Sequence, residues 1–138
     1  NIEVLSTEPA DWDPAKVVQL WESYLAAYPN INAAFFHNDD MALAALEVMR
    51  ARHRTETLIG GVDAMPPAIR AVVDGSMYAT VRNSSCRIHG GAIVAGVEAA
   101  LAGKKTPATP PKQIIIDGPI VTQANAPGLL WMEDHFLI

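Results

Sequence analysis

The chain contains 138 residues, of which 50% are hydrophobic and 18% are charged. That length fits one domain or a piece of one, and the apolar share excludes an intrinsically disordered chain. The net charge is −5, and the ten Lys and Arg residues are scattered, whereas a nucleic-acid-binding surface needs them clustered. The single Cys86 excludes an internal disulfide and a thiolate metal cluster. No apolar run approaches the roughly 18 to 20 residues that cross a bilayer.

The first half of the chain alternates between strand-like and helical patterns. A short apolar run predicts a strand over residues 2–5. Asp13 and Pro14 then predict the start of a helix, because Asp is a favoured N-cap and Pro fits the first helical turn. The apolar residues of this helix recur with a period near 3.6: Val17, Leu20, Trp21, Tyr24, Leu25 and Tyr28. A buried strand is predicted over residues 33–37, and a second helix over residues 40–52.

The second half continues the alternation. Pro66 and Pro67 open a short helix that ends before Gly75, which fits a left-handed C-terminal cap. The Gly60-Gly61 pair inside the preceding strand lets a helix approach that strand closely. The remaining predicted elements are strands over residues 57–62, 78–82 and 113–117, a long helix over residues 87–102, and a last apolar run over residues 120–122.

Alternating β and α units of this length predict an α/β fold, with a parallel sheet and helices on both of its faces. In such sheets, ligands bind beyond the carboxyl ends of the strands. The polar and aromatic residues that follow the predicted strands are therefore the candidates for a binding site. They are Trp12, Asn38, Asp63 and Asn83.

These candidates have structural explanations beside the functional ones. Asp39 is well placed to cap the helix that follows it, and an acid in the first turn favours the helix dipole. The neighbouring Asn38 offers a donor and an acceptor to a ligand hydroxyl, and we expect it to contact ligand. Asp63 either accepts hydrogen bonds from adjacent ligand hydroxyls or caps the helix at Pro66. Trp12 either stacks on the apolar face of a pyranose or packs as a hydrophobic staple before its helix.

Catalytic and metal-binding patterns are weak. The four His residues lack the spacing of a zinc site, and no glycine pair belongs to a nucleotide-binding motif. Ser84, Ser85 and Cys86 lie near His89, but no acid is placed to orient that histidine. We therefore expect no metal, no cofactor and no enzymatic activity.

Five segments together resemble the periplasmic sugar-binding proteins of the ribose and galactose type, which serve ABC transporters. The segments are PADWD, YPNINAAFFHNDDMALAALEVMR, GGVDAMPPAIRAVVDGSMYATVRN, GVEAALAGKK and IVTQAN. The resemblance spans roughly residues 2–125, and its most specific part is the run from Pro29 to Leu46, a strand followed by Asn-Asp-x-Met-Ala. It implies a protein of two α/β lobes joined by three crossings, with the sugar bound in the cleft between them.

The resemblance also implies roles for parts of this chain, which looks like the carboxy-terminal half of such a protein. Four residues of this half would bind the sugar: Trp12, Asn38, Asp63 and Asn83. Asn83 stands where the family usually has the longer Gln. Residues 1–83 would form the carboxy-terminal lobe, residues 84–112 a hinge crossing, helix and linker that belong to the other lobe, and residues 113–138 a return strand and tail. A central strand before residue 2 would be missing.

The expected partners follow from the same resemblance. They are a sugar of the pentose or hexose class and an ABC transporter permease, in the periplasm or another extracytoplasmic space, with a signal peptide upstream of a chain that opens at Asn1. In an isolated half the apolar helix over residues 87–102 must cover something, so we expect a homodimer that exchanges it. The alternative function is the effector-sensing domain of a LacI-type transcriptional repressor, which shares the fold and the Asn-Asp motif. The segment VVDGSMYATV favours the transport proteins.

Overall fold

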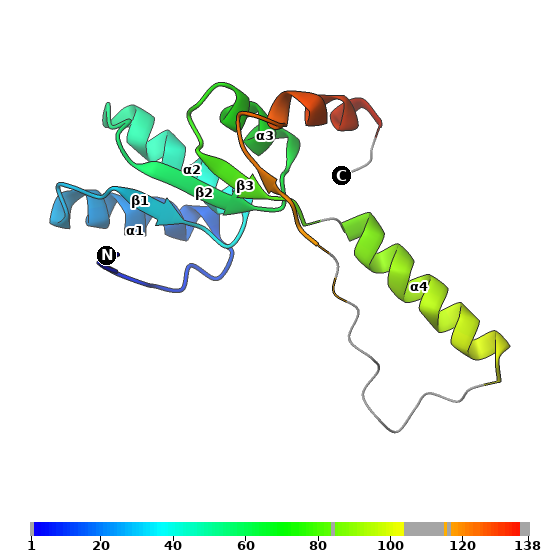
Figure 1. The fold of residues 1–138 in the computed structure, drawn as a ribbon. Helices are drawn as coiled ribbons and strands as arrows, with labels where there is room; N and C mark the ends of the chain where they lie inside the picture. Colours follow the sequence, from blue (N-terminus) through cyan, green and yellow to red (C-terminus); the bar gives the residue numbers. More distant parts are fainter. Residues whose placement is uncertain (1, 84, 104–114, 116, 136–138) are drawn as a thin grey trace.

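The computed structural model describes residues 2–83, 85–103, 115 and 117–135. Its described part contains one sheet of four strands in the order β1-β2-β3-β4 (Figure 1). The strands are β1 (Ala33–Phe35), β2 (Leu58–Val62), β3 (Ala79–Val81) and β4 (Ile120–Val121). The first three strands run parallel, and β4 pairs antiparallel to β3. The predicted α/β class with a parallel sheet is confirmed.

Helices alternate with the strands as the sequence predicts. They are α1 (Pro14–Ala27), α2 (Asp39–Ala51), α3 (Pro66–Val73), α4 (Ser85–Leu101) and the 3₁₀ helix η1 (Ala126–His135). The Asp13 carboxylate accepts a hydrogen bond from Ala15 N at 2.9 Å and so caps α1, as predicted. Gly75, with φ 82°, follows α3 in the left-handed conformation, and Gly103, with φ 64°, does the same after α4.

One face of the sheet carries the core. Ile59, Thr80 and Val121 are each at most 1% exposed, and α2 and α3 pack over this face. Both helices lie on the same side because β1, β2 and β3 follow one another in the sheet order, and right-handed crossovers in one direction all fall on one face. Helix α1 lies beside α2, and its Trp21 meets Phe36 edge-on at 5.7 Å between ring centroids.

The opposite face of the sheet is open in the described part of the chain. Phe35 is 63% exposed, Leu58 50% and Ile120 60%, and strand alternation and the pairing register put all three on that face. The sequence predicted helices on both faces. The difference arises because covering the second face needs a crossover in the reverse direction, and the described strands contain none.

Residues 2–5 do not form the predicted strand. Ile2 is 96% exposed and Val4 75%, and the segment pairs with no strand among the described residues. Tyr24 of α1 and its C-cap residue Tyr28 hold this part of the chain instead, since Tyr28 Oη donates to Leu5 O at 3.3 Å and Ser6 Oγ donates to Tyr24 Oη at 3.2 Å. A strand needs a neighbour to pair with, which local apolar patterning cannot supply.

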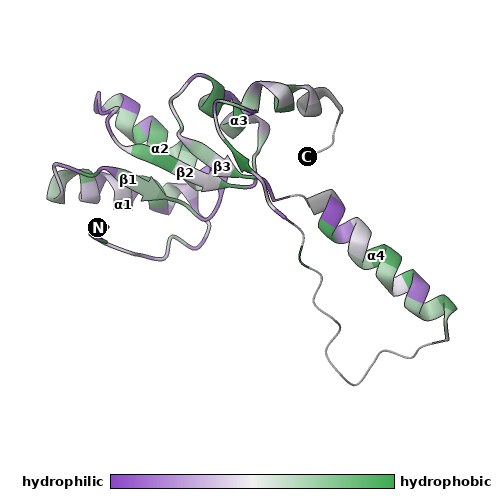
Figure 2. Cartoon of the chain, viewed as in Figure 1, coloured by the Kyte–Doolittle hydropathy of each residue, from purple (hydrophilic) through white to green (hydrophobic). Residues whose placement is uncertain are grey.

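The predicted strand over residues 113–117 lies mostly outside the described residues. The apolar run after it does reach the sheet, because Ile120 and Val121 form β4. Between β3 and β4, the helix α4 projects away from the sheet (Figure 1). Figure 2 shows apolar residues over much of α4, and its larger apolar side chains are exposed, from 42% at Ile88 to 84% at Leu101.

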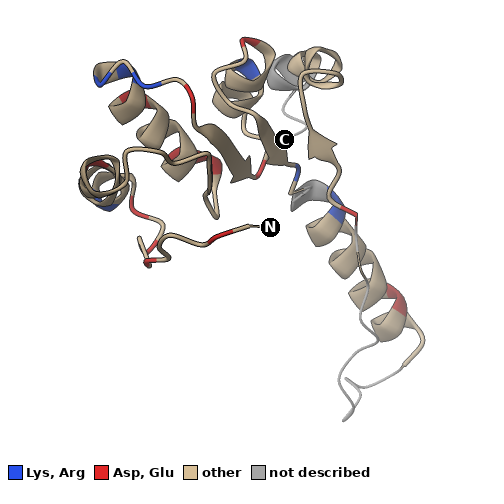
Figure 3. Cartoon of the chain, turned by 60° about the vertical axis from the view of Figure 1, so that its left-hand side comes forward, with Lys and Arg blue, Asp and Glu red and all other residues tan. Residues whose placement is uncertain are grey.

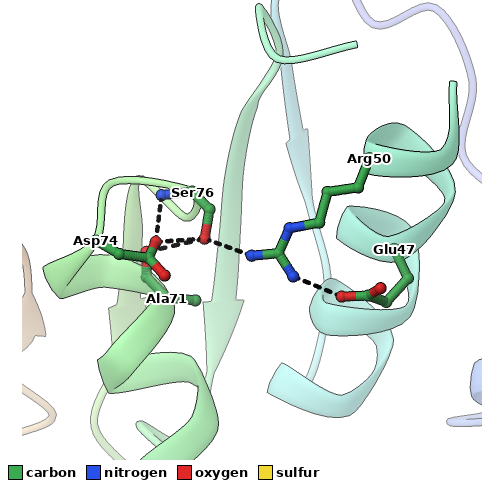
Figure 4. A network of polar contacts seen from close by, with 5 residues as sticks. All are labelled: Glu47, Arg50, Ala71, Asp74 and Ser76. Atoms are coloured by element: carbon green, nitrogen blue, oxygen red, sulfur yellow. Dashed lines mark hydrogen bonds and ion pairs between the residues drawn. The ribbon is translucent and has the colours of Figure 1, made fainter. Parts of the chain in front are cut away.

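Polar contacts join α2 to the turn after α3, at the edge where the parallel strands begin (Figure 4). The Arg50 guanidinium donates to Glu47 Oε1 at 2.5 Å and to Ser76 Oγ at 3.1 Å. Ser76 donates to Asp74 Oδ1 from Oγ at 2.6 Å and from its backbone N at 2.8 Å, and these two bonds lower the pKa of Asp74. Because the network is exposed to solvent, its ion pair and hydrogen bonds add little to the stability of the fold, and their main effect is on the conformation of the turn.

Two features of the whole described chain bear on function. Its Lys and Arg residues are distributed over separate elements, with Lys16 on α1, Arg50 on α2, Arg70 on α3 and Arg87 on α4 (Figure 3). In addition, none of the described helices has the length and apolar character needed to cross a membrane.

Candidate functional site

Asp63 and Asn83 come together at the carboxyl ends of β2 and β3. Asp63 follows the last residue of β2, and its backbone N donates to Val81 O at 2.8 Å, so the two strand ends are held in register. Asn83 Nδ2 donates to Asp63 Oδ1 at 3.3 Å. Asp63 is half-buried and Asn83 is exposed, so this carboxylate–amide pair presents hydrogen-bond acceptors and donors at the edge of the sheet.

The alternative in which Asp63 caps α3 is not what the structure shows. Met65 is the N-cap of that helix, and no side chain makes the capping hydrogen bond. Asp63 instead has φ 110° and Ala64 φ 55°, so the chain reverses sharply between β2 and α3. Residues other than glycine rarely adopt such angles, and they concentrate at ligand-binding and catalytic sites.

Asn38 takes the capping role that the sequence assigned to Asp39. Its Oδ1 accepts a hydrogen bond from Met41 N at 2.9 Å, and its backbone conformation is extended, as an N-cap requires. The cap uses only Oδ1, so the Nδ2 group remains a donor at the end of β1. Capping and ligand contact by Asn38 are therefore compatible.

Asp39 is a buried carboxyl group, which sequence reasoning missed. Its side chain is 0% exposed, Oδ1 accepts from Thr80 Oγ1 at 2.7 Å, and Oδ2 accepts from Met65 N at 2.8 Å. Burial raises the pKa of Asp39 to about 6, and the Asp63 carboxylate adds to that rise. One signal was present: Asn38 and Asp39 are both good caps, yet a helix start uses only one, and Asn38 has the better position.

Trp12 lies in the turn before α1 and does not belong to the core. Its side chain is 68% exposed, and the consecutive residues Asp11 and Trp12 have φ 53° and 55°. Lys16 Nζ donates to Asp11 Oδ2 at 2.7 Å and ties this turn to α1. Helix α1 begins at the end of the sheet toward which β1 and β2 point (Figure 1). Trp12 is thus a free aromatic surface near that edge, with no ring or hydrogen-bond contact to the other three candidates among the described residues.

The arrangement carries the kinds of groups that can hydrogen-bond and stack on a small polyhydroxyl compound. The edge offers a carboxylate acceptor, two amide groups and an exposed indole ring, supplied by the loops after β1, β2 and β3 and by the turn before α1. Within the described residues, no three His, Cys, Asp or Glu side chains are grouped so as to hold a metal ion.

The chain belongs to the family described as the periplasmic binding protein domain, which it matches over residues 1–105. Among curated proteins it is similar to the ribose import binding protein RbsB of Escherichia coli (strain K12), 33% identical over 111 residues. That match covers 80% of this chain and 37% of the relative. It is also similar to the D-allose-binding periplasmic protein of the same organism, 32% identical over 125 residues, which are 89% of this chain and 40% of the relative.

The chain is also similar to solved structures of sugar-binding proteins. The periplasmic binding component of the arabinose ABC transporter from Shewanella sp. ANA-3 is 28% identical with a TM-score of 0.80, covering 96% of this chain and 44% of the other. A galactofuranose-binding protein is 21% identical with a TM-score of 0.84, and there the likeness concerns the fold alone. The chain thus spans less than half the length of each of these proteins. The family to which it belongs consists of solute-binding proteins.

Proposed function

We propose that this chain supplies one wall of a cleft that binds a small sugar of the pentose or hexose class for delivery to an ABC transporter. The observation that carries the proposal is the Asp63–Asn83 pair at the carboxyl ends of β2 and β3. Adjacent sugar hydroxyls can donate to the carboxylate and accept from the amide, which is the chemistry a polyol needs. The named ligands of the relatives, ribose, allose and arabinose, fit this chemistry.

In this proposal each candidate residue has one task. Asp63 accepts hydrogen bonds from two sugar hydroxyls, and Asn83 and Asn38 contribute amide groups. Trp12 stacks its exposed ring on the C–H face of the sugar. No residue acts as a nucleophile or a general base, so the bound sugar is released unchanged.

The partners and the division of the chain belong to the same proposal. Residues 1–83 act as the carboxy-terminal lobe, residues 84–112 belong to the other lobe, and residues 113–138 return to the sheet and form the tail. The projecting α4 and the return at β4 support that division. The loaded protein delivers its sugar to a transporter permease outside the cytoplasm. Where this chain is present alone, a second copy covers α4, giving a homodimer.

The test is a sugar titration of the 138-residue chain followed by nuclear magnetic resonance, which also detects weak binding. D-ribose and D-allose are the probes. We expect sugar-dependent shifts at the Trp12 indole and at the Asn38 and Asn83 side chains. In Asp63→Ala these shifts should fall strongly, because losing a charged acceptor weakens binding about 10- to 150-fold. Trp12→Ala should weaken the response through lost stacking.

The matched control is Asp74→Ala, which removes an exposed aspartate at the opposite edge of the sheet and should leave the response intact. Unchanged shifts in Asp63→Ala contradict the site. Chemical conversion of either sugar contradicts the binding role. A LacI-type effector domain predicts the same sugar response, and an upstream helix-turn-helix in the intact gene identifies that alternative.

A further inference from the structure

The loop that carries Asp63 has a conformation that its own residues do not favour. Asp63 and Ala64 are consecutive non-glycine residues with φ 110° and 55°. Such conformations persist where the surrounding structure holds them in place. The direction of the Asp63 carboxylate, and hence its contact with Asn83, depends on whatever holds this loop.

Two side chains from other elements hold the loop. Met65 N donates to Asp39 Oδ2 at 2.8 Å, and Ala64 N donates to Thr80 Oγ1 at 3.2 Å. Thr80 Oγ1 in turn donates to Asp39 Oδ1 at 2.7 Å. The two backbone amides that follow Asp63 are therefore both bonded, one to α2 and one to β3.

Gly61 makes room for this arrangement. A Cβ atom on Gly61 would overlap Asp39 Oδ1 and would lie 2.7 Å from Met77 Cε. The second glycine of the Gly-Gly pair thus admits the start of α2, as the sequence predicted, and in particular admits a carboxyl group. Thr80 is 1% exposed, so the cluster is closed to water on the sheet side.

Asp39 does not touch a ligand itself. Its side chain is 0% exposed, and each carboxylate oxygen already accepts a hydrogen bond from the protein. Because burial raises its pKa only to about 6, the group is mainly ionised at neutral pH, and an ionised acceptor forms the stronger bonds. Among its hydrogen bonds, the one to Met65 N connects Asp39 to the loop that carries Asp63.

We infer that Asp39 and Thr80 are positioning residues that fix the loop of Asp63 and Ala64, so that Asp63 and Asn83 form the pair that receives the ligand. The identity of that ligand as a sugar rests on the proposed function. The holding of the loop rests on the contacts alone. The two parts are therefore tested by separate measurements on the same variants.

The first measurement is amide hydrogen exchange in the full 138-residue chain, without ligand. Thr80→Val deletes the hydroxyl while keeping the shape, and Asp39→Asn removes one of the two acceptor oxygens. Thr80→Val should speed exchange at the Ala64 amide, which loses its acceptor, and Asp39→Asn should speed exchange at the Met65 amide, whose charged acceptor becomes a weaker neutral one, each by on the order of tenfold. Thr80→Ser keeps the hydroxyl and should restore slow exchange. Asp40→Asn is the matched control, since Asp40 is exposed.

The second measurement repeats the D-ribose and D-allose titrations on the same variants. The Asn83 side-chain response should be lost in Thr80→Val and kept in Thr80→Ser and Asp40→Asn. A general loss of stability would speed exchange across α1 as well, whereas loss of positioning leaves the α1 amides unchanged.

The results of the two measurements separate the possibilities. Unchanged exchange at Ala64 and Met65 in both Thr80→Val and Asp39→Asn, or a uniform increase that includes α1, overturns the inference. A full sugar response in Thr80→Val despite fast loop exchange also overturns it. Loop exchange as expected, with no sugar response in the unsubstituted chain, contradicts the proposed function while supporting the holding of the loop by Asp39 and Thr80.

Discussion

The buried carboxyl group of Asp39 ties the stability of the fold to pH. Burial raises its pKa from 3.8 to about 6, so the folded chain holds this proton more tightly than the unfolded chain does. The stability that this group contributes is fully present below pH 3.8 and is lost as pH rises through about 6. Asp74 has the opposite effect on the pH dependence of stability, because hydrogen bonds from Ser76 lower its pKa. Because these two pH effects on stability oppose each other, the effect of Asp39 is isolated by comparing the unsubstituted chain with a variant at Asp39.

We expect Asp39→Asn to change the pH dependence of unfolding. The free energy of unfolding of the unsubstituted chain, relative to Asp39→Asn, should fall by up to about 3 kcal/mol between about pH 4 and pH 7. Urea unfolding across that range, followed by circular dichroism, measures the difference. Asp40→Asn serves as the control and should run parallel to the unsubstituted chain. Parallel profiles for Asp39→Asn as well would mean that the Asp39 carboxyl titrates normally.

At the scale of elements, the start of α2 combines two tasks in adjacent residues. Asn38 caps the helix through Oδ1, and Asp39, one position later, reaches across the sheet to Thr80 and Met65. Because the cap fixes where α2 begins, it also fixes where the Asp39 carboxylate points. The start of α2 therefore positions residues at the carboxyl edge of the sheet as well as residues in the core.

Substitutions at Asn38 should separate capping from ligand contact. Asn38→Ala is expected to lower the free energy of unfolding by about 1 kcal/mol, because the Met41 amide loses its acceptor. Asn38→Asp keeps a good cap but has no Nδ2 donor, so it should retain stability and weaken the sugar response. Urea unfolding and the sugar titration report the two effects. Equal sugar responses in Asn38→Asp and the unsubstituted chain would leave Asn38 with the capping role alone.

At the scale of the whole molecule, two apolar surfaces are uncovered in the described chain. One is the open sheet face around Phe35 and Leu58, and the other is the projecting α4, where Ile93 is 66% exposed and Leu101 84%. Monomeric proteins seldom expose apolar area of this kind, and such surfaces lead to association. Exchange of α4 between identical chains would cover it at low cost, because a swap remakes the same contacts between two copies.

We therefore expect the 138-residue chain to associate in solution. Light scattering at micromolar concentration should give about twice the 14.8 kDa of one chain. The double variant Val97→Glu with Leu101→Glu places charges on α4 and should return the mass to that of one chain. Gln19→Glu adds a charge at an exposed position of α1 and is the control. A stable monomer of the unsubstituted chain would mean that α4 folds back onto its own sheet.

Features that depend on residues close in the chain were determined by the sequence alone. The cap at Asp13, the turn at Gly75 and the alternation of strands and helices each follow from neighbours a few positions apart, and the structure confirms them. The positions of Asp63 and Asn83 after their strands were predictable for the same reason. Parallel strands necessarily end at one edge, so their pairing needed only the correct element order.

Features that depend on distant contacts were decided by the tertiary structure. Asp39 became a buried acceptor rather than a cap because Met65 and Thr80, 26 and 41 positions away, supply its hydrogen bonds. The segment over residues 2–5 failed to form a strand because no described neighbour pairs with it. A sequence pattern reports which side chains are apolar or polar. Which of them find partners is determined only when separate elements meet.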